Sequence, residues 1–131
     1  MTTDMKKRIL TAASLLLALI LLLAACAPAY EGDGRIGSYI AYGADGKTVV
    51  YRLVLEEDGR GSITHYPSFG GETREDVIFE IKDGNINVHG TEGVGGVIGR
   101  SELSGEIAPI GDAYTFELRS ADGVLANFVK E

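Results

Sequence analysis

The sequence predicts an all-β domain, an antiparallel up-and-down meander of about eight strands, which follows an N-terminal signal-peptide helix. The first observation is a series of turn glycines separated by 12 to 15 residues: Gly46, Gly59, Gly71, Gly84, Gly96, Gly111 and Gly123. Most of them stand in Asp-Gly or Gly-Gly pairs, which suit hairpin turns because these turns need positive φ angles. Seven such turns separate eight strands, each returning beside its predecessor.

The second observation is the alternation of apolar and polar residues between the turns, which is typical of strands with one buried face. The apolar sets, in chain order, are Val49, Tyr51, Leu53 and Leu55; Val77, Phe79 and Ile81; Ile86 and Val88; Leu103 and Ile107; Tyr114, Phe116 and Leu118; Val124, Ala126 and Phe128. No stretch after Gly37 has helical spacing with start and stop signals. Closure of the meander into a small barrel removes exposed strand edges, and a two-sheet β-sandwich is the alternative.

Residues 1–25 have the composition of a secretory signal peptide. A positive region, Lys6-Lys7-Arg8, precedes a stretch over 9–25 that is apolar except for Thr11 and Ser14. A membrane-spanning helix needs roughly 20 apolar residues, so this stretch is slightly short for a permanent anchor.

The residues Leu23-Ala24-Ala25-Cys26 end this stretch and include the single cysteine of the chain. They resemble the lipobox of bacterial lipoproteins, in which a branched apolar residue and two small residues precede an invariable cysteine. The resemblance implies that Leu23, Ala24 and Ala25 are recognised by the signal peptidase and that the chain is cut before Cys26. It also implies diacylglycerol on the Cys26 thiol and an acyl chain such as palmitate on the new amino terminus. An ordinary cleaved signal and an uncleaved anchor are the alternatives.

We therefore expect Cys26 to be held in membrane lipid, in the cell membrane or the outer membrane, on the extracytoplasmic side of the cell envelope. Residues 26–36 form the lipidated cysteine and its tether, and residues 37–131 form the all-β domain. Three of the 12 basic and one of the 19 acidic residues precede Cys26, which leaves a net charge of −9. This acidity argues against nucleic acid as a partner, because such binding depends on Lys and Arg. With one cysteine, the domain has no internal disulfide, and we expect a monomer.

Gly37-Ser38-Tyr39 stands where lipocalins carry Gly-x-Trp on their first strand, with Tyr39 in place of the tryptophan. Lys130, near the end of the chain, corresponds to the basic residue that packs over that aromatic ring. The domain thus resembles the lipocalin-like, or calycin-type, small barrels. The resemblance implies a closed barrel and, as one possible function, a carrier that holds a small apolar ligand inside it.

The sequence contains no strong catalytic or metal-binding motif. The pattern G-x-G-x-x-G at 32–37 does not follow a predicted strand or open a helix, so it does not predict a dinucleotide site. His65 and His89 lack a thiolate or clustered carboxylates, so we expect no metal, and no cofactor. The acidic pairs Glu56-Glu57 and Glu75-Asp76 border predicted turns, where solvated acids are ordinary. We expect that the protein is not an enzyme.

Three residues are candidates for contact with a ligand or partner: His65, Tyr66 and Tyr114. His65 shares parity with Ile63 and should point inward, as a packed core residue unless a bulge turns it outward. The large inward side chains predict a filled interior, because an eight-stranded barrel is just wide enough for side chains to fill. We therefore expect a membrane-anchored lipoprotein whose domain is a binding or interaction module, acting through the loops 65–72 and 91–99. A lipocalin-like carrier is the alternative.

Overall fold

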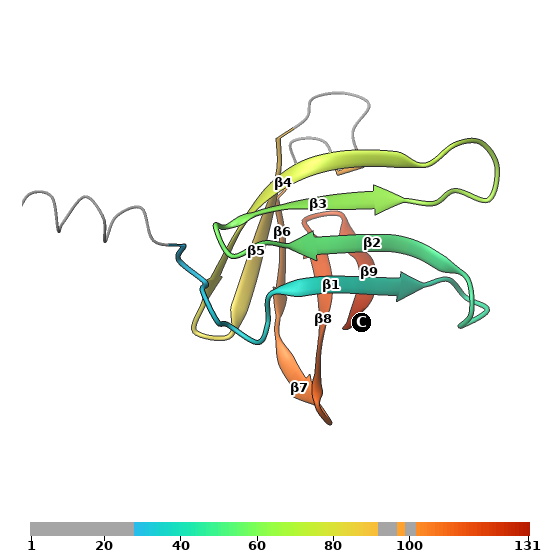
Figure 1. The fold of residues 1–131 in the computed structure, drawn as a ribbon. Coiled ribbons are helices and arrows are strands. Elements are labelled where there is room, and N and C mark those ends of the chain that lie inside the picture. Colours follow the sequence, from blue (N-terminus) through green and yellow to red (C-terminus); the bar gives the residue numbers. More distant parts are fainter. Residues whose placement is uncertain (1–27, 92–96, 99–101) are drawn as a thin grey trace, which may run out of the picture.

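The computed structural model describes residues 28–91, 97–98 and 102–131, and these residues form an all-β domain (Figure 1). The predicted signal-peptide helix and the lipobox with Cys26 lie outside the described residues. The strands are β1 (Gly37–Tyr42), β2 (Val49–Leu55), β3 (Arg60–His65), β4 (Thr73–Lys82), β5 (Asn85–Gly90), β6 (Glu102–Glu106), β7 (Ala108–Ile110), β8 (Ala113–Ser120) and β9 (Gly123–Lys130). In the described part of the chain, no helix has the length and hydrophobicity needed to span a membrane.

The strands form one antiparallel sheet that closes on itself as an up-and-down barrel (Figure 1). β1 pairs with β9 through Tyr39 opposite Lys130, and β6 meets β8 where Ser104 lies opposite Arg119. β6 and β7 are two parts of one predicted strand, interrupted at Ile107, so the barrel has the eight-strand order that the turn spacing predicts. The barrel is confirmed, and the sandwich alternative is wrong because β1–β9 and β6–β8 close the sheet.

The turn between β4 and β5 shows why Asp-Gly pairs mark the hairpins. Lys82 and Asn85 are paired across it, and the two residues between them have φ angles of 53° (Asp83) and 80° (Gly84). A two-residue turn of type I′ requires positive φ at both positions. Between β3 and β4 it is Gly70, rather than Gly71, that has positive φ.

The predicted inward residues form most of the core. Rings of Tyr39, Phe116 and Phe128 pack at its centre, with centroids 4.7 Å apart for Tyr39–Phe116 and 5.7 Å for Phe116–Phe128. The predicted residues that are buried are Leu53, Leu55, Val77, Phe79, Ile81, Ile86, Val88, Leu103, Ile107, Phe116, Leu118 and Phe128. Tyr51, Tyr114 and Ala126 are partly buried against them.

Val124 is the predicted inward residue that the structure contradicts, since its side chain is 50% exposed. The register of β8 and β9 shifts between Leu118 and Arg119, so that Leu118 faces Ala126 while Arg119 faces Val124. The shift changes the phase of the first residues of β9, and Leu125 packs against the core instead.

Glycine at position 105 allows β6 and β8 to approach closely enough to close the barrel. A Cβ atom on Gly105 would lie 2.2 Å from the backbone oxygen of Glu117. No side chain fits at that distance, so the close approach of β6 and β8 requires a glycine at position 105.

Candidate functional site

The two ends of the barrel differ, and we name them by their connections. The closed end carries the turns 56–59, 83–84 and 111–112, and the loop end carries the connections 43–48, 66–72 and 121–122. In Figure 1 the described chain begins beside the closed end, on the side away from the β3–β4 connection. Of the candidate contact residues, His65 and Tyr66 lie at the loop end and Tyr114 lies at the closed end, so the three do not form one site.

His65 packs against an aromatic ring at the loop end. It is the cross-strand neighbour of Tyr51, and the two rings are stacked with centroids 4.8 Å apart and planes 24° from parallel. The ring of Tyr51 lies 6.3 Å from that of Phe128 in the core, and burial raises the pKa of the Tyr51 hydroxyl. His65 therefore lies on the same face as Ile63, as its parity predicts, in the surroundings of a packed aromatic residue.

Tyr66 begins the β3–β4 connection and is held by its backbone and by its hydroxyl. Its amide donates to the Val50 carbonyl at 2.8 Å, and its hydroxyl accepts a hydrogen bond from Arg52 Nη1 at 3.4 Å. Arg52 Nη2 also donates to Glu131 Oε1 at 2.8 Å. Hydrogen bonds from Ser38 and Arg52 hold the pKa of Glu131 below its usual range. These hydrogen bonds connect Tyr66, the first residue of the β3–β4 connection, to β2 and to Glu131.

Phe69 lies in the same β3–β4 connection and is the most exposed large hydrophobic residue in the described part of the chain, at 93%. Gly70, next to it, has a φ angle of 90° and allows the chain to turn there. Exposed aromatic side chains are enriched where proteins bind one another. The predicted interaction loop 65–72 thus begins with two residues that contact the barrel, His65 and Tyr66, and exposes the ring of Phe69 to solvent.

Glu75 is buried, which corrects the prediction that it is a solvated turn residue. β4 begins at Thr73, so Glu75 lies within the strand on the same face as Val77 and is 1% exposed. Its carboxylate accepts a hydrogen bond from the Ile98 amide at 2.8 Å. Glu75 therefore holds Ile98 against the core at the loop end. The alternation of Glu75 with Val77 and Phe79 in the sequence is the signal that could have identified this position.

Residues 30–36, which the sequence assigns to the tether, pack across the closed end. Tyr30 makes three contacts there: its amide donates to the Glu57 carbonyl at 2.9 Å, its hydroxyl accepts from the Ile81 amide at 2.9 Å, and its ring stacks on Phe79 with centroids 5.1 Å apart. Tyr30 is thereby attached to β4.

The other half of this segment reaches β8 and β9. The position of a Cβ on Gly34 would lie 3.6 Å from the ring of Tyr114, and Lys130 Nζ donates to the Gly34 carbonyl. Because Tyr30 contacts β4 and Gly34 contacts β8 and β9, the segment crosses the mouth of the barrel. We call residues 30–36 the plug. Tyr114 lies against the plug at the closed end and not at the loop end.

An ion pair and a buried hydroxyl stabilise the plug. Arg35 Nη2 lies 2.6 Å from Asp33 Oδ2, and hydrogen bonds from Arg35 lower the pKa of Asp33. The Tyr39 hydroxyl donates to the Arg35 carbonyl at 2.6 Å. Burial of Tyr39 raises the pKa of this hydroxyl to about 12, so it remains a hydrogen-bond donor at neutral pH.

The structure places Tyr39 and Lys130, two residues on which the lipocalin resemblance rests, on adjacent strands. They are directly opposite in the register of β1 and β9, and Tyr39 is fully buried. The aliphatic part of Lys130 lies over Gly37, where a Cβ atom would be 3.0 Å from Lys130 Cε. Gly37 also has a φ angle of 139°, which other residues rarely adopt, and this accounts for a glycine at the start of β1.

The described surface has hollows around the barrel wall and its loop end, and three of them are well formed. One of about 520 Å³, lined by Asn87, Ser104 and Arg119 among others, lies on the outer side of the β6–β8 seam. Another of about 380 Å³ lies on the outer face of β3 and β4. A third of about 240 Å³ lies at the loop end and is partly lined by Val97 and Leu125. The aromatic rings of Tyr39, Phe116 and Phe128 pack in the buried core and line none of these three hollows.

Within the described ranges, no group of three or more His, Cys, Asp or Glu side chains is placed to hold a metal ion. No protein-family model matches the chain, and neither a curated protein nor a solved structure matches it. The function therefore has to be inferred from the residues and geometry of this chain.

Proposed function

We propose that the protein is a membrane-anchored lipoprotein of the bacterial cell envelope whose small β-barrel is a non-enzymatic binding or interaction module. The observation that carries the proposal is the position of Cys26. This lipobox cysteine stands four residues before Tyr30, which is bonded to the closed end of the barrel. Lipid on Cys26 would therefore hold the folded domain directly at a membrane surface.

The charge of the domain also favours a covalent lipid anchor. Residues 26–131 carry a net charge of −9, and anionic lipid attracts basic segments rather than acidic ones. The domain therefore supplies no electrostatic attraction of its own. Two or three acyl chains hold a protein stably, since each buried CH₂ contributes about 0.8 kcal/mol.

The packed interior favours action through the surface over transport of a ligand within the barrel. Tyr39, Phe116 and Phe128 are at most 3% exposed, and their rings pack against one another in the core of the barrel. Displacing packed side chains costs roughly 1–3 kcal/mol for each insertion. The loop end, with the exposed ring of Phe69, is the surface that the module offers.

Metabolic labelling with a palmitate analogue tests the anchor. Wild-type protein should be labelled and processed, whereas Cys26→Ala should remain an unlabelled precursor. Phe69→Ala is a matched control that changes an exposed residue far from the lipobox, and it should be labelled like the wild type. Equal labelling of wild type and Cys26→Ala would contradict the proposal.

Titration with fatty acids and hydrophobic dyes tests the mode of binding. Residues 26–131 with Cys26→Ser should show no saturable binding at micromolar concentration, because the interior is filled. Saturable one-to-one binding that is lost in Tyr114→Ala or His65→Ala, but kept in Tyr42→Ala at the exposed surface, would establish the carrier alternative instead.

A further inference from the structure

We infer that the closed end of the barrel faces the phospholipid bilayer and that the loop end, with Phe69, points away from it. This inference rests on the proposed lipid anchor at Cys26. It assigns the membrane-facing surface to residues around Tyr30 and the β7–β8 turn, and it leaves the β3–β4 connection free for a protein partner in the envelope.

The length of chain between the lipid and the barrel sets the first limit. Tyr30 is the fourth residue after Cys26, and a fully extended chain spans about 3.5 Å per residue, or about 14 Å in all. Tyr30 is fixed to Glu57, Phe79 and Ile81 by two hydrogen bonds and a ring stack. Tyr30, and with it the part of the closed end around Glu57, Phe79 and Ile81, is therefore held within about 14 Å of the attachment point.

The length of the barrel sets the second limit. Ile81 and Thr73 lie at opposite ends of β4, eight residues apart, and a strand of that length extends about 26 Å. Tyr30 contacts Ile81, whereas the connection with Phe69 ends directly before Thr73. The link from Cys26 to Tyr30 is about half as long as this strand. It is therefore too short for an inverted barrel, in which the loop end would lie at the membrane and the closed end would point away from it.

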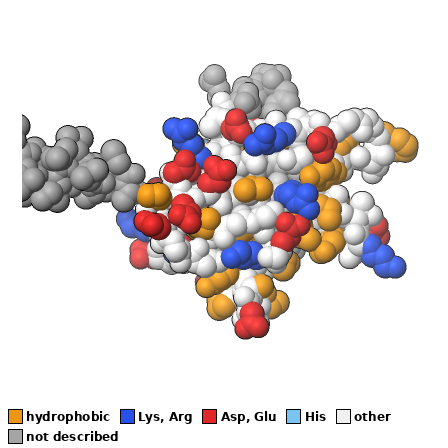
Figure 2. Space-filling view, viewed as in Figure 1, with side chains coloured by type: hydrophobic (Ala, Val, Ile, Leu, Met, Phe, Trp, Pro, Cys, Tyr) orange, Lys and Arg blue, Asp and Glu red, His pale blue; other side chains and the backbone are white. Residues whose placement is uncertain are grey.

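Charge opposes a third arrangement, in which the barrel lies on its side with both ends at the lipid. Figure 2 shows Lys and Arg side chains interspersed with Asp and Glu over the visible face, without a basic patch to hold that face against anionic headgroups. Residues 26–131 carry a net charge of −9. The closed end itself carries Glu57, Asp58 and Asp83. Charge therefore disfavours contact along the whole side, whereas the short link to Tyr30, and not charge, keeps the closed end near the membrane.

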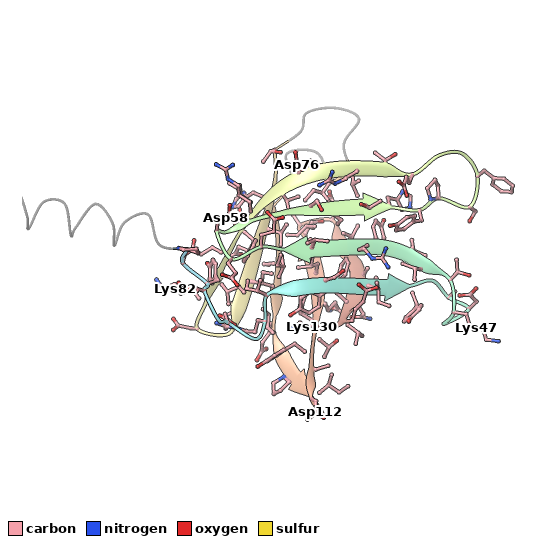
Figure 3. All side chains as sticks on the ribbon, in the orientation of Figure 1. Lys47, Asp58, Asp76, Lys82, Asp112 and Lys130 are labelled. Carbon is pink, nitrogen blue, oxygen red and sulfur yellow. The ribbon has the colours of Figure 1, made fainter. Side chains whose placement is uncertain are left out.

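Each end of the barrel carries an exposed apolar residue that can be replaced by a fluorescent tryptophan, so that the distance of that end from the membrane can be measured. Ile110, in β7 beside the turn that includes Asp112, is 56% exposed at the closed end, and Phe69 is 93% exposed at the loop end. Figure 3 shows Asp112 at the tip of the β7–β8 hairpin, well away from the β3–β4 connection. Substitution of either exposed residue leaves the core intact.

Energy transfer from a single tryptophan tests the orientation, because the chain contains no tryptophan of its own. Residues 26–131 carrying Ile110→Trp or Phe69→Trp are coupled through the Cys26 thiol to a maleimide-headgroup lipid in vesicles of phosphatidylcholine and phosphatidylglycerol with dansyl-headgroup lipid. We expect transfer to dansyl at least about threefold more efficient for Ile110→Trp than for Phe69→Trp. Equal transfer, or stronger transfer from Phe69→Trp, would overturn the inference.

Two controls make the result specific. Blocking Cys26 with N-ethylmaleimide before addition of vesicles should abolish transfer in both variants; persistent transfer would show membrane binding that does not depend on the link, and would overturn the inference. Inserting about twelve Gly and Ser residues after Ala27 should bring the two variants close to equality, because the link then exceeds the length of β4. An unchanged ratio would refute the role of the short link.

Chemical coupling also separates this inference from the proposed function. The maleimide lipid forms a thioether at Cys26 whether or not a cell acylates it. Absence of palmitate labelling in cells would therefore remove the proposed lipoprotein anchor, whereas equal transfer on vesicles would remove the orientation alone.

Discussion

Residues 30–36 should contribute strongly to the stability of the barrel, and Tyr30 should account for most of that contribution. The Phe79 amide donates to the Gly59 carbonyl at the edge of β3. Two residues further along the same edge of β4, the Ile81 amide donates to the Tyr30 hydroxyl. At Ile81 the strand β3 no longer runs beside β4, so β3 offers no other acceptor for this amide. Tyr30→Ala removes the acceptor, and it also removes the ring stacked on Phe79.

The size of the effect follows from these two contacts. Leaving a partly buried amide without its partner costs about 1–3 kcal/mol, and a stacked aromatic pair contributes about 0.5–1.5 kcal/mol. The free energy of unfolding should therefore fall by about 2–4 kcal/mol. In a domain of this size each kcal/mol lowers the melting temperature by about 4–8 °C, so the melting temperature of Tyr30→Ala should fall by about 8–32 °C.

Thermal and urea unfolding, followed by circular dichroism on residues 26–131 with Cys26→Ser, measures this effect. Tyr30→Phe keeps the ring and should lose about 1–3 kcal/mol. Tyr42→Phe, at a half-exposed tyrosine of the loop end, is the matched control and should change stability by less than about 0.5 kcal/mol. Residues 37–131 should still fold as a monomeric β domain, with a loss at least equal to that of Tyr30→Ala. A melting temperature of Tyr30→Ala within about 2 °C of the parent would refute the docked position of the segment.

Three further predictions concern the core, the seam and the plug. Phe116→Ala should lower the free energy of unfolding in urea by about 3–5 kcal/mol, because its ring is buried between two others. Gly105→Ala should lower it by more than about 2 kcal/mol, since the new methyl group meets the Glu117 carbonyl, whereas Gly71→Ala has open space and should be nearly neutral. Arg35 lowers the pKa of Asp33, so the Asp33–Arg35 pair should stabilise the fold above about pH 4 and lose this effect as pH falls. Melting curves of wild type and Asp33→Asn should therefore converge in acid; a constant difference from neutral pH down to about pH 2 would contradict this.

The barrel could be predicted from the sequence because both of its signals are local. Side chains alternate along every strand, so the inward set from Leu53 to Phe128 follows once the turns are placed. The errors occur where local spacing is interrupted. Val124 is exposed because the register shift at Leu118 changes the phase of β9, and Glu75 is buried because β4 starts before the acidic pair.

The organisation of the two ends could not be predicted in the same way, because it depends on contacts between distant residues. Tyr30 and Ile81 are 51 residues apart, and a single tyrosine in a glycine-rich stretch has no periodicity that would indicate packing. The stretch 26–36 therefore has the composition of a flexible tether. Tyr114 lies at the closed end for a similar reason: alternation predicts which face a residue occupies, and the topology decides which end.

Docking of Tyr30 changes what the lipid anchor would do. An undocked tether from Cys26 to Gly37 has 11 residues and a maximum reach of about 38 Å, whereas the link to the docked Tyr30 has four residues and reaches about 14 Å. The effective concentration of a tethered domain falls as roughly the −3/2 power of the length of its link, so docking confines the barrel to roughly one fifth of the space. A partner held at the same membrane therefore meets the loop end at a correspondingly higher effective concentration, provided that it reaches the height of Phe69. A weak contact through the ring of Phe69 can then be sufficient for binding, because the anchor and the plug keep the loop end close to a partner at the same membrane.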